Sequence, residues 1–108
     1  MRIQITGRHC EVPRAVLDRT ESQVQALVKY EARAAAADVV YTDEKHERRI
    51  EVLIHIDGGE PVVAHGEGVN FRSALDQVVE RLRRMLRKRR ERQRDHQAPP
   101  LSQALEAE

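Results

Sequence analysis

The strongest constraint on the fold is an alternating hydrophobic segment in the middle of the chain. Branched aliphatic residues occupy every second position from Ile50 to Ile56. Successive side chains of a strand point to opposite faces of a sheet, so this pattern predicts a strand with one buried face. The motif at 57–59 (DGG) predicts a tight hairpin turn, because glycine adopts positive φ without steric cost. The segment Pro61–His65 is then predicted to return as an antiparallel strand.

Two other segments are predicted to join this sheet. The isoleucines of residues 2–6 alternate with polar residues, and Gly7 is predicted to end that strand. The segment Asp38–Thr42 (DVVYT) predicts another strand, and the charged segment Asp43–Arg48 predicts a surface turn. After the returning strand, Gly66–Val69 is predicted to break the pattern.

Two further segments have the three-to-four-residue apolar spacing of amphipathic helices. The first is predicted from Pro13, which suits a first helical turn, to about Ala34. The second is predicted from an Asn70 N-cap to about Asp95, roughly 37 Å of helix. The apolar stripe of this second helix consists of Phe71, Leu75, Val78, Leu82 and Leu86.

The predicted order is β-α-β-β-β-α, which indicates an α+β fold with two helices packed on one face of a four-stranded sheet. The first two strands are predicted to be parallel because a helix separates them, and the hairpins antiparallel. A chain of 108 residues has room for one small domain, which we assign to residues 1–96. Pro99-Pro100 stops the helix, so residues 97–108 are predicted to form a disordered acidic tail.

The charge distribution is the most informative feature for function. Nine of the 19 Lys and Arg residues lie between Arg81 and Arg94, with Glu91 as the only acid, so this window has a net charge of +8. The whole chain has a net charge of +1, so the remaining residues carry −7. The helix macrodipole accounts for two or three cations near a C-terminus, but nine repel one another. The window therefore predicts an anionic partner.

The positions of these cations on the second helix suggest how they are presented. Four lie within an arc of roughly 80° beside the apolar stripe: Arg81, Arg84, Lys88 and Arg92. Four lie on the far side: Arg83, Arg87, Arg90 and Arg94. Arg89 continues the apolar stripe itself, where a guanidinium is a poor core residue. The helix is therefore predicted to leave the sheet after Leu86 and to project as a basic rod.

The composition narrows the class of polyanion. Eight of the nine cations are Arg, whose planar guanidinium binds phosphate at two points. A membrane surface requires a free apolar face, and here the sheet needs that face. Single-strand readers stack bases on aromatic side chains, and this chain has only Tyr30, Tyr41 and Phe71. Structured RNA and nonspecific DNA both remain open.

No residue pattern predicts catalysis. The five His residues are scattered and Cys10 is the only cysteine, so metal spacing and an internal disulfide are both absent from the sequence. His55 and His65 are predicted to approach each other across the hairpin as a surface pair. We expect a protein that is not an enzyme, with no cofactor, metal or small-molecule substrate. The chain lacks an apolar run of about 20 residues or a signal peptide, so we expect a cytoplasmic protein without a membrane partner.

Four segments, in this order, resemble the ribosome hibernation-promoting factor family, which includes the ribosome-associated inhibitor of translation. They are IQITGRHCEV, PRAVLDRTESQVQAL, EVLIHIDGGE and ALDQVVERLRRMLRKRRER, and the resemblance covers about residues 1–96. It implies a fold similar to double-stranded-RNA-binding domains. It also implies a protein that occupies the tRNA and mRNA channel of the small ribosomal subunit, inhibits translation and preserves idle ribosomes during stress or stationary phase.

In the family, basic residues of the last helix contact ribosomal RNA, and the matching residues here are Arg81, Arg84, Lys88, Arg90 and Arg92. With Arg87 of the same helix added, the predicted RNA-binding residues are Arg81, Arg84, Arg87, Lys88, Arg90 and Arg92. The chain departs from the family at residues 70–72 (NFR), and Gln23 and Ala26 replace lysines that are usual on the first helix. The length implies a short form without the second domain by which long forms pair ribosomes.

Two alternatives come from other classes of protein. The first is a nonspecific nucleic-acid-binding or transcription-modulating domain, which would bind free duplex DNA as well as ribosomes. The second is a protein-interaction module whose basic helix docks on an acidic partner, although the few aromatic residues disfavour an interface dominated by hot spots.

Overall fold

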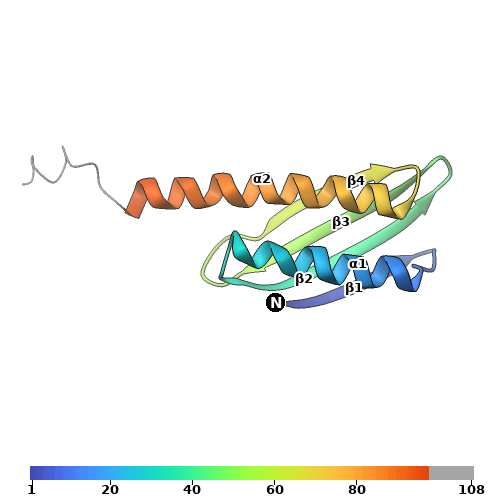
Figure 1. Ribbon diagram of the computed structural model, residues 1–108, viewed down its shortest axis with the longest axis horizontal. Coiled ribbons are helices and arrows are strands. Elements are labelled where there is room, and N and C mark those ends of the chain that lie inside the picture. The colour runs from blue at the N-terminus through green and yellow to red at the C-terminus, as the bar shows by residue number, and fades with distance from the viewer. Residues whose placement is uncertain (98–108) are drawn as a thin grey trace, which may run out of the picture.

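Seven elements follow one another in the computed structural model, which describes residues 1–97 (Figure 1). They are β1 (Arg2–Arg8), α1 (Arg14–Gln25), the short 3₁₀ helix η1 (Ala26–Lys29), β2 (Ala34–Glu44), β3 (Glu47–Ile56), β4 (Val62–Gly68) and α2 (Phe71–Gln97). The predicted β-α-β-β-β-α order is confirmed. The tail predicted at residues 97–108 lies, from residue 98 onward, outside the described residues, and Gln97 belongs to α2.

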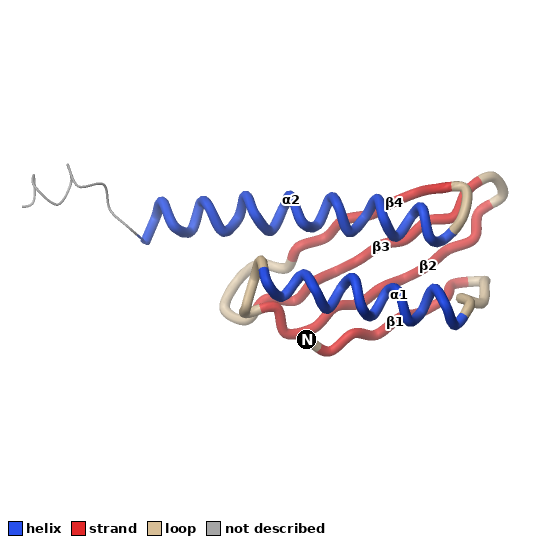
Figure 2. Tube along the Cα trace, in the orientation of Figure 1, coloured by secondary structure: helices blue, strands red, loops and turns tan. Residues whose placement is uncertain are grey.

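The four strands form one sheet in the order β1-β2-β3-β4. β1 is parallel to β2, as expected for two strands joined by the crossing helix α1, and the two other pairs are antiparallel. Both helices lie on the same face of the sheet and run in the same direction (Figure 2). Within residues 1–97, no helix covers the other face, so one layer of helices packs on one layer of strands. β1 and β4 are the edge strands because they end the strand order.

The core lies between the sheet and the helices. Alternate residues of β3 are fully buried at Ile50, Val52 and Ile54, as the period-two pattern predicts. Leu82 of α2 is 0% exposed, and the stripe residues Leu75, Val78 and Leu86 are buried with it. Burying one such side chain contributes about 1.5–3 kcal/mol. The amphipathic half of α2 is therefore fixed on the sheet by hydrophobic burial.

The predicted end of the first helix is wrong. The α-helix ends at Gln25, η1 follows, and Ala34–Ala37 belongs to β2. In the turn between η1 and β2, the Glu31 carboxylate accepts hydrogen bonds from the backbone N–H (3.1 Å) and Nε (3.3 Å) of Arg33. Such local bonds offer the backbone an alternative to the helix. The alanines that follow belong to the sheet, because Ala37 pairs with Ile3 of β1 and with Ile54 of β3.

Two further boundaries differ from the predictions. The turn before the central strand is only two residues long (45–46), because Asp43 pairs with Arg48 across the hairpin, and their side chains form an ion pair of 2.7 Å. The segment Gly66–Val69 does not break the pattern until Val69, because β4 continues to Gly68. Gly66 is buried where α2 crosses the sheet, since a Cβ there would lie 2.4 Å from the carbonyl oxygen of Ala74. The strand needs glycine at this position for close packing.

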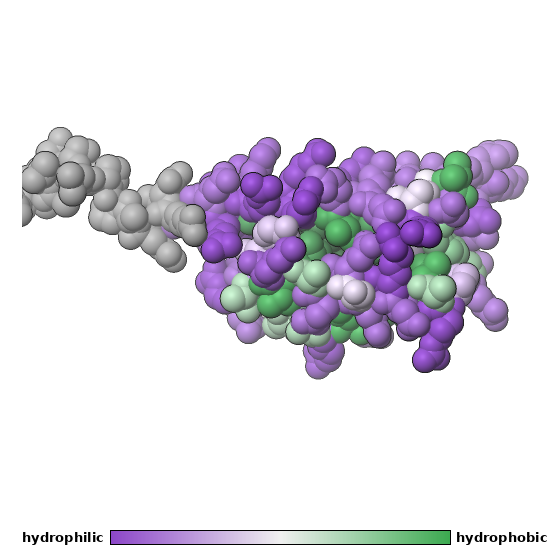
Figure 3. Space-filling model, viewed as in Figure 1, coloured by the Kyte–Doolittle hydropathy of each residue, from purple (hydrophilic) through white to green (hydrophobic). Residues whose placement is uncertain are grey.

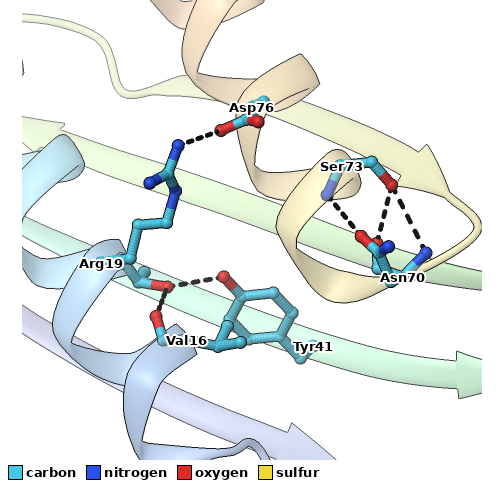
Figure 4. A network of polar contacts seen from close by, with 7 residues as sticks. Val16, Arg19, Tyr41, Asn70, Ser73 and Asp76 are labelled. Carbon is cyan, nitrogen blue, oxygen red and sulfur yellow. Dashed lines mark hydrogen bonds and ion pairs between the residues drawn. The ribbon is translucent and has the colours of Figure 1, made fainter.

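Polar contacts set the position of both helices (Figure 4). The Asn70 side-chain oxygen accepts the Ser73 backbone N–H at 2.8 Å, which confirms Asn70 as the N-cap of α2. Arg19 of α1 donates to Asp76 of α2 at 3.2 Å and so links the two helices. The N-terminal half of α2 is therefore held by its cap, by the sheet and by α1.

Candidate nucleic-acid interface

The candidate interface is built on the C-terminal half of α2. The stripe that packs on the sheet ends at Leu86, which is 1% exposed, and the helix continues to Gln97. Figure 1 shows this last part of α2 extending beyond the end of the sheet. In Figure 3, hydrophilic side chains dominate the outer surface of α2, and apolar residues show mainly between the helices.

All six residues predicted to bind RNA are exposed on α2. They are Arg81, Arg84, Arg87, Lys88, Arg90 and Arg92. Arg83 and Arg89, which belong to the same basic window, are partly buried. Because α2 is continuous, the six cations are held on one rigid element within three turns, a spacing suited to successive phosphate groups.

Arg89 corrects the expectation that the helix leaves the sheet after Leu86. Its Nη1 donates to the carbonyl oxygen of Glu60 at 3.2 Å, and the guanidinium lies against Gly59 in the β3–β4 turn. The long aliphatic part of Arg lets the charged group reach past the apolar stripe to the turn. Contact with the sheet therefore extends one helical turn further than predicted, and α2 leaves the sheet only after Arg89.

Arg81 is bound to the strand beside the helix. Its Nη1 donates to the carbonyl oxygen of His65 in β4 at 2.6 Å. The guanidinium is exposed, but one of its donors is already used within the protein. Sequence periodicity placed Arg81 beside the apolar stripe, but it gave no signal for this contact with the backbone.

Glu80 neutralises part of the charge at the start of the basic window. Its carboxylate is paired with Arg83 and, at 3.3 Å, with Arg84. The hydrogen bond from Arg83 is the main cause that lowers the pKa of the Glu80 carboxyl, and in return it raises the pKa of Arg83. The i,i+3 and i,i+4 spacings of Glu80 with Arg83 and Arg84 predict such ion pairs from the sequence alone. The Arg84 side chain nevertheless remains 72% exposed and available to a ligand.

The other four predicted cations are not engaged with carboxylates or carbonyls in the part of the chain that the structure describes: Arg87, Lys88, Arg90 and Arg92. Arg87 and Arg90 lie near Tyr30 at the end of η1, in a shallow depression with Glu91. Exposed cations without a protein partner can neutralise phosphates of a nucleic acid and release the counterions condensed on it. The end of α2 therefore carries a dense group of exposed cations without carboxylate partners among the described residues.

A shallow groove runs between this end of α2 and β4. Its floor includes Val63 and Met85, whose side chains are 48% and 40% exposed, and Lys88 and Arg92 line it on the helix side. The groove is open and mixed in polarity, so it lacks the enclosed apolar character of a small-molecule site. It widens the cationic surface from the helix to the edge of the sheet.

α1 offers a different surface. Asp18 and Glu21 are exposed along it, and Arg14 is 3.8 Å from Asp18. The side-chain amide of Gln23, at a position where the resemblance implies lysine, lies 3.1 Å from the guanidinium of Arg19. The cationic surface is therefore concentrated on α2 and does not continue across α1.

The remaining candidate sites of the sequence give no catalytic arrangement. His55 pairs with Asp38 at 2.9 Å and not with His65, because His65 lies opposite Glu51 in the β3–β4 register. Within the described residues, no group of three or more His, Cys, Asp or Glu side chains could hold a metal ion. In the same part of the chain, neither helix is both long and apolar enough to span a membrane.

A family model and individual known sequences match this chain over most of its length. A family model described as Sigma 54 modulation protein / S30EA ribosomal protein matches residues 3–94. The ribosome hibernation promoting factor of Azotobacter vinelandii is 32% identical over 97 residues, which cover 90% of each chain. The ribosome hibernation promoting factor of Escherichia coli K12 is 28% identical over 96 residues, which cover 89% of this chain and 100% of that one.

Two solved structures share the fold. A ribosomal subunit interface protein from Coxiella burnetii superposes with a TM-score of 0.78 at 18% identity, covering 84% of this chain and 99% of that one. The N-terminal domain of Protein Y from Thermus thermophilus superposes with a TM-score of 0.73 at 27% identity, covering 82% of this chain and 98% of that one. The first of these likenesses concerns the fold alone.

Proposed function

Because the chain belongs to the Sigma 54 modulation protein / S30EA ribosomal protein family, we propose that it is a ribosome hibernation factor. It binds the small subunit, occupies the channel used by tRNA and mRNA, and so inhibits translation while preserving idle ribosomes. The observation that carries this proposal is the rigid, cationic end of α2, which extends beyond the sheet (Figure 1).

Phosphate contact is assigned to the exposed cations of α2. Five of them have no bond to the backbone among the described residues: Arg84, Arg87, Lys88, Arg90 and Arg92. The sixth predicted residue, Arg81, already donates to His65. A helix is about 10–12 Å wide with its side chains, so it fits a channel lined by RNA and contacts phosphates on more than one side. Counterion release then supplies most of the affinity.

The aromatic residues favour structured RNA over single strands. Tyr41 is fully buried, and Phe71 packs edge-on against its ring with centroids 5.0 Å apart. Tyr30 is only partly exposed, beneath the cation Lys29. The described surface therefore offers no row of aromatic rings on which successive bases could stack. Recognition of RNA backbone and shape is the mode that these side chains support.

The ribosome as partner determines where and when the protein acts. A factor that occupies vacant ribosomes acts in the cytoplasm, and it acts when initiation is slow, as in starvation or stationary phase. No cofactor, metal or chemical step is needed, because occupation of the channel is sufficient for inhibition.

A charge-reversal variant tests this function. The double variant Arg84→Glu, Lys88→Glu should lose both binding to vacant small subunits and inhibition of translation. Its two carboxylates would repel the RNA phosphates that Arg84 and Lys88 attract. The matched control replaces Arg2→Glu and Lys45→Glu, two exposed residues outside α2 that give the same change in net charge. Unchanged circular dichroism must accompany the loss. Inhibition by the α2 variant equal to that of the control variant would contradict the proposal.

Nonspecific nucleic-acid binding is the second candidate, and the absence of base-reading aromatic residues on the described surface favours it as the alternative. A gel shift with duplex DNA separates the two functions. A hibernation factor prefers vacant small subunits over duplex DNA at equal phosphate concentration and moderate salt. Equal affinity for both would indicate the nonspecific domain instead.

A further inference from the structure

The outer edge of β4 is covered by side chains of α2. β4 is the last strand of the sheet, so alternate residues direct their backbone N–H and C=O groups away from β3. Arg81 donates to the carbonyl oxygen of His65 at 2.6 Å, and the backbone N–H of Glu67 donates to Oε1 of Gln77 at 2.7 Å. His65 and Glu67 are thus two of the outward-facing residues of this edge, and by the same alternation Val63 is the next.

The residues of α2 that reach this edge are spaced by four. Gln77, Arg81, Met85 and Arg89 lie on one flank of the helix, since side chains at i and i+4 share a face. Met85 is beside Val63 in the groove between helix and strand. Arg89 donates to the carbonyl oxygen of Glu60 at 3.2 Å, beyond the start of β4. One flank of α2 therefore follows the strand from its last residues to the turn that precedes it.

We infer that this flank clamps α2 to the sheet edge, and that Arg81 and Arg89 are positioning residues and not phosphate ligands. This inference rests on the proposed function and divides the basic window into two groups. Arg81 and Arg89 fix the angle at which α2 leaves the sheet. The phosphate ligands are Arg84, Arg87, Lys88, Arg90 and Arg92.

The contacts of the two groups differ in kind. Arg81 and Arg89 each donate to a backbone carbonyl that the sheet leaves unpaired, and Arg89 also lies against Gly59, where a Cβ would meet its guanidinium. Covering an open strand edge is a recurrent need in β proteins, because free edges pair with other chains. Arg87 and Arg90 lie on another side of the helix, near Tyr30. A cation already bonded to the protein gains less from a phosphate than a free one.

Hydrogen exchange tests the clamp without any ribosome. Arg81→Met and Arg89→Met keep an unbranched side chain but remove the charge and the donors, and Arg87→Met and Arg90→Met are matched controls on the same helix. In the Arg81→Met and Arg89→Met variants, hydrogen exchange of the amides of β4 and of α2 after Leu82 should accelerate about fivefold. Each variant loses one hydrogen bond that holds the helix against the edge of the sheet. In the control pair the rates should equal those of the unmodified chain.

The salt dependence of binding to vacant small subunits provides the second measurement. Each lost phosphate contact lowers the slope of log K against log salt by about 0.7–0.9. Arg87→Met and Arg90→Met should each lower the slope by that amount. Arg81→Met and Arg89→Met should weaken binding about two- to fivefold while leaving the slope unchanged, because a looser helix keeps all its phosphate contacts.

The two measurements separate the possible failures. Lower slopes for Arg81→Met and Arg89→Met, with unchanged exchange rates, would overturn the inference and make both residues phosphate ligands. Accelerated exchange together with an unchanged slope would establish it. If the unmodified chain does not bind small subunits, the proposed function fails, while the exchange rates still decide whether the clamp exists.

Discussion

At the level of single residues, the hydroxyl group of Tyr41 combines deep burial with a defined partner. The Thr20 hydroxyl donates to the carbonyl oxygen of Val16 at 2.6 Å, so its oxygen accepts from the Tyr41 hydroxyl, also at 2.6 Å (Figure 4). A hydroxyl has one proton, which fixes this direction. Burial raises the pKa of Tyr41, because the phenolate form would lose its hydration. This hydrogen bond joins α1 to β2, and Tyr41 can donate it only while its hydroxyl is protonated.

The raised pKa of Tyr41 predicts a loss of stability in alkali. The folded chain holds this proton more tightly than the unfolded chain, whose tyrosine titrates at about pH 10. The free energy of unfolding is therefore unaffected by this group well below pH 10 and falls as the pH rises from there through the folded pKa. Urea unfolding at about pH 8 and pH 10.5 should show a larger loss for the unmodified chain than for Tyr41→Phe. Equal losses would mean that Tyr41 does not titrate with unfolding.

Gly66 makes the close approach of α2 to β4 possible. A Cβ at this position would lie 2.4 Å from the carbonyl oxygen of Ala74 and 2.9 Å from the backbone nitrogen of Val78. Gly66→Ala should therefore lower the free energy of unfolding by about 1–3 kcal/mol, because helix backbone must move. Gly58→Ala is the control, since space around it is open and only its φ of 70° opposes a side chain. Chemical denaturation should give a smaller loss there, about 1 kcal/mol.

At the level of elements, α2 begins at a defined cap. Asn70 accepts the Ser73 N–H through its side chain at 2.8 Å, and the Ser73 hydroxyl donates back to the Asn70 carbonyl oxygen at 3.0 Å. Asn70→Ala should reduce the free energy of unfolding by about 1 kcal/mol, the usual contribution of such a cap. Asn70→Asp is the comparison variant, because a carboxylate accepts the same bond. A loss of equal size in both variants would show that the side-chain bond does not stabilise the helix.

The sequence is most informative where one physical effect dominates an element. The alternation of apolar residues from Ile50 to Ile56 predicted the strand β3. The apolar stripe from Phe71 to Leu86 predicted the helix α2 and the face that packs on the sheet. It was misleading near Ala34, because alanine favours helix locally. The helix was predicted to reach that residue and the strand to begin at Asp38, whereas the sheet register assigns Ala34–Ala37 to β2. It was misleading again at Gly66, where glycine indicates close packing and not the end of the strand.

The candidate site could be predicted in the same partial way. The charge of the basic window and the exposure of its far side follow from composition and helical periodicity. The contacts of Arg81 and Arg89 with carbonyl oxygens do not, because they depend on which edge of the sheet lies beneath the helix. A guanidinium has five donors and a long flexible stem, so its partner is decided by tertiary structure.

At the level of the whole molecule, opposite charges are separated along the chain. The window from Arg81 to Arg94 carries +8 within a protein of net charge +1. This charge lies on the second half of α2, from the part that packs along β4 to the part that extends past the sheet (Figure 1). Such a dipolar distribution orients the protein during approach to a polyanion and makes association sensitive to salt. Asp43 and Glu44 of the β2–β3 hairpin lie at the opposite end of the molecule (Figure 1), where they disfavour contact with a polyanion.

The dissociation constant for vacant small ribosomal subunits, measured between about 50 and 200 mM salt, tests the central claim most directly. If Arg84, Arg87, Lys88, Arg90 and Arg92 each neutralise one phosphate, the constant should rise roughly 100- to 500-fold over this range. Binding should also disappear when mRNA and initiator tRNA occupy the subunit. Absence of binding at the lower salt, or a rise of less than about tenfold, would contradict an interface built from α2 cations and phosphates.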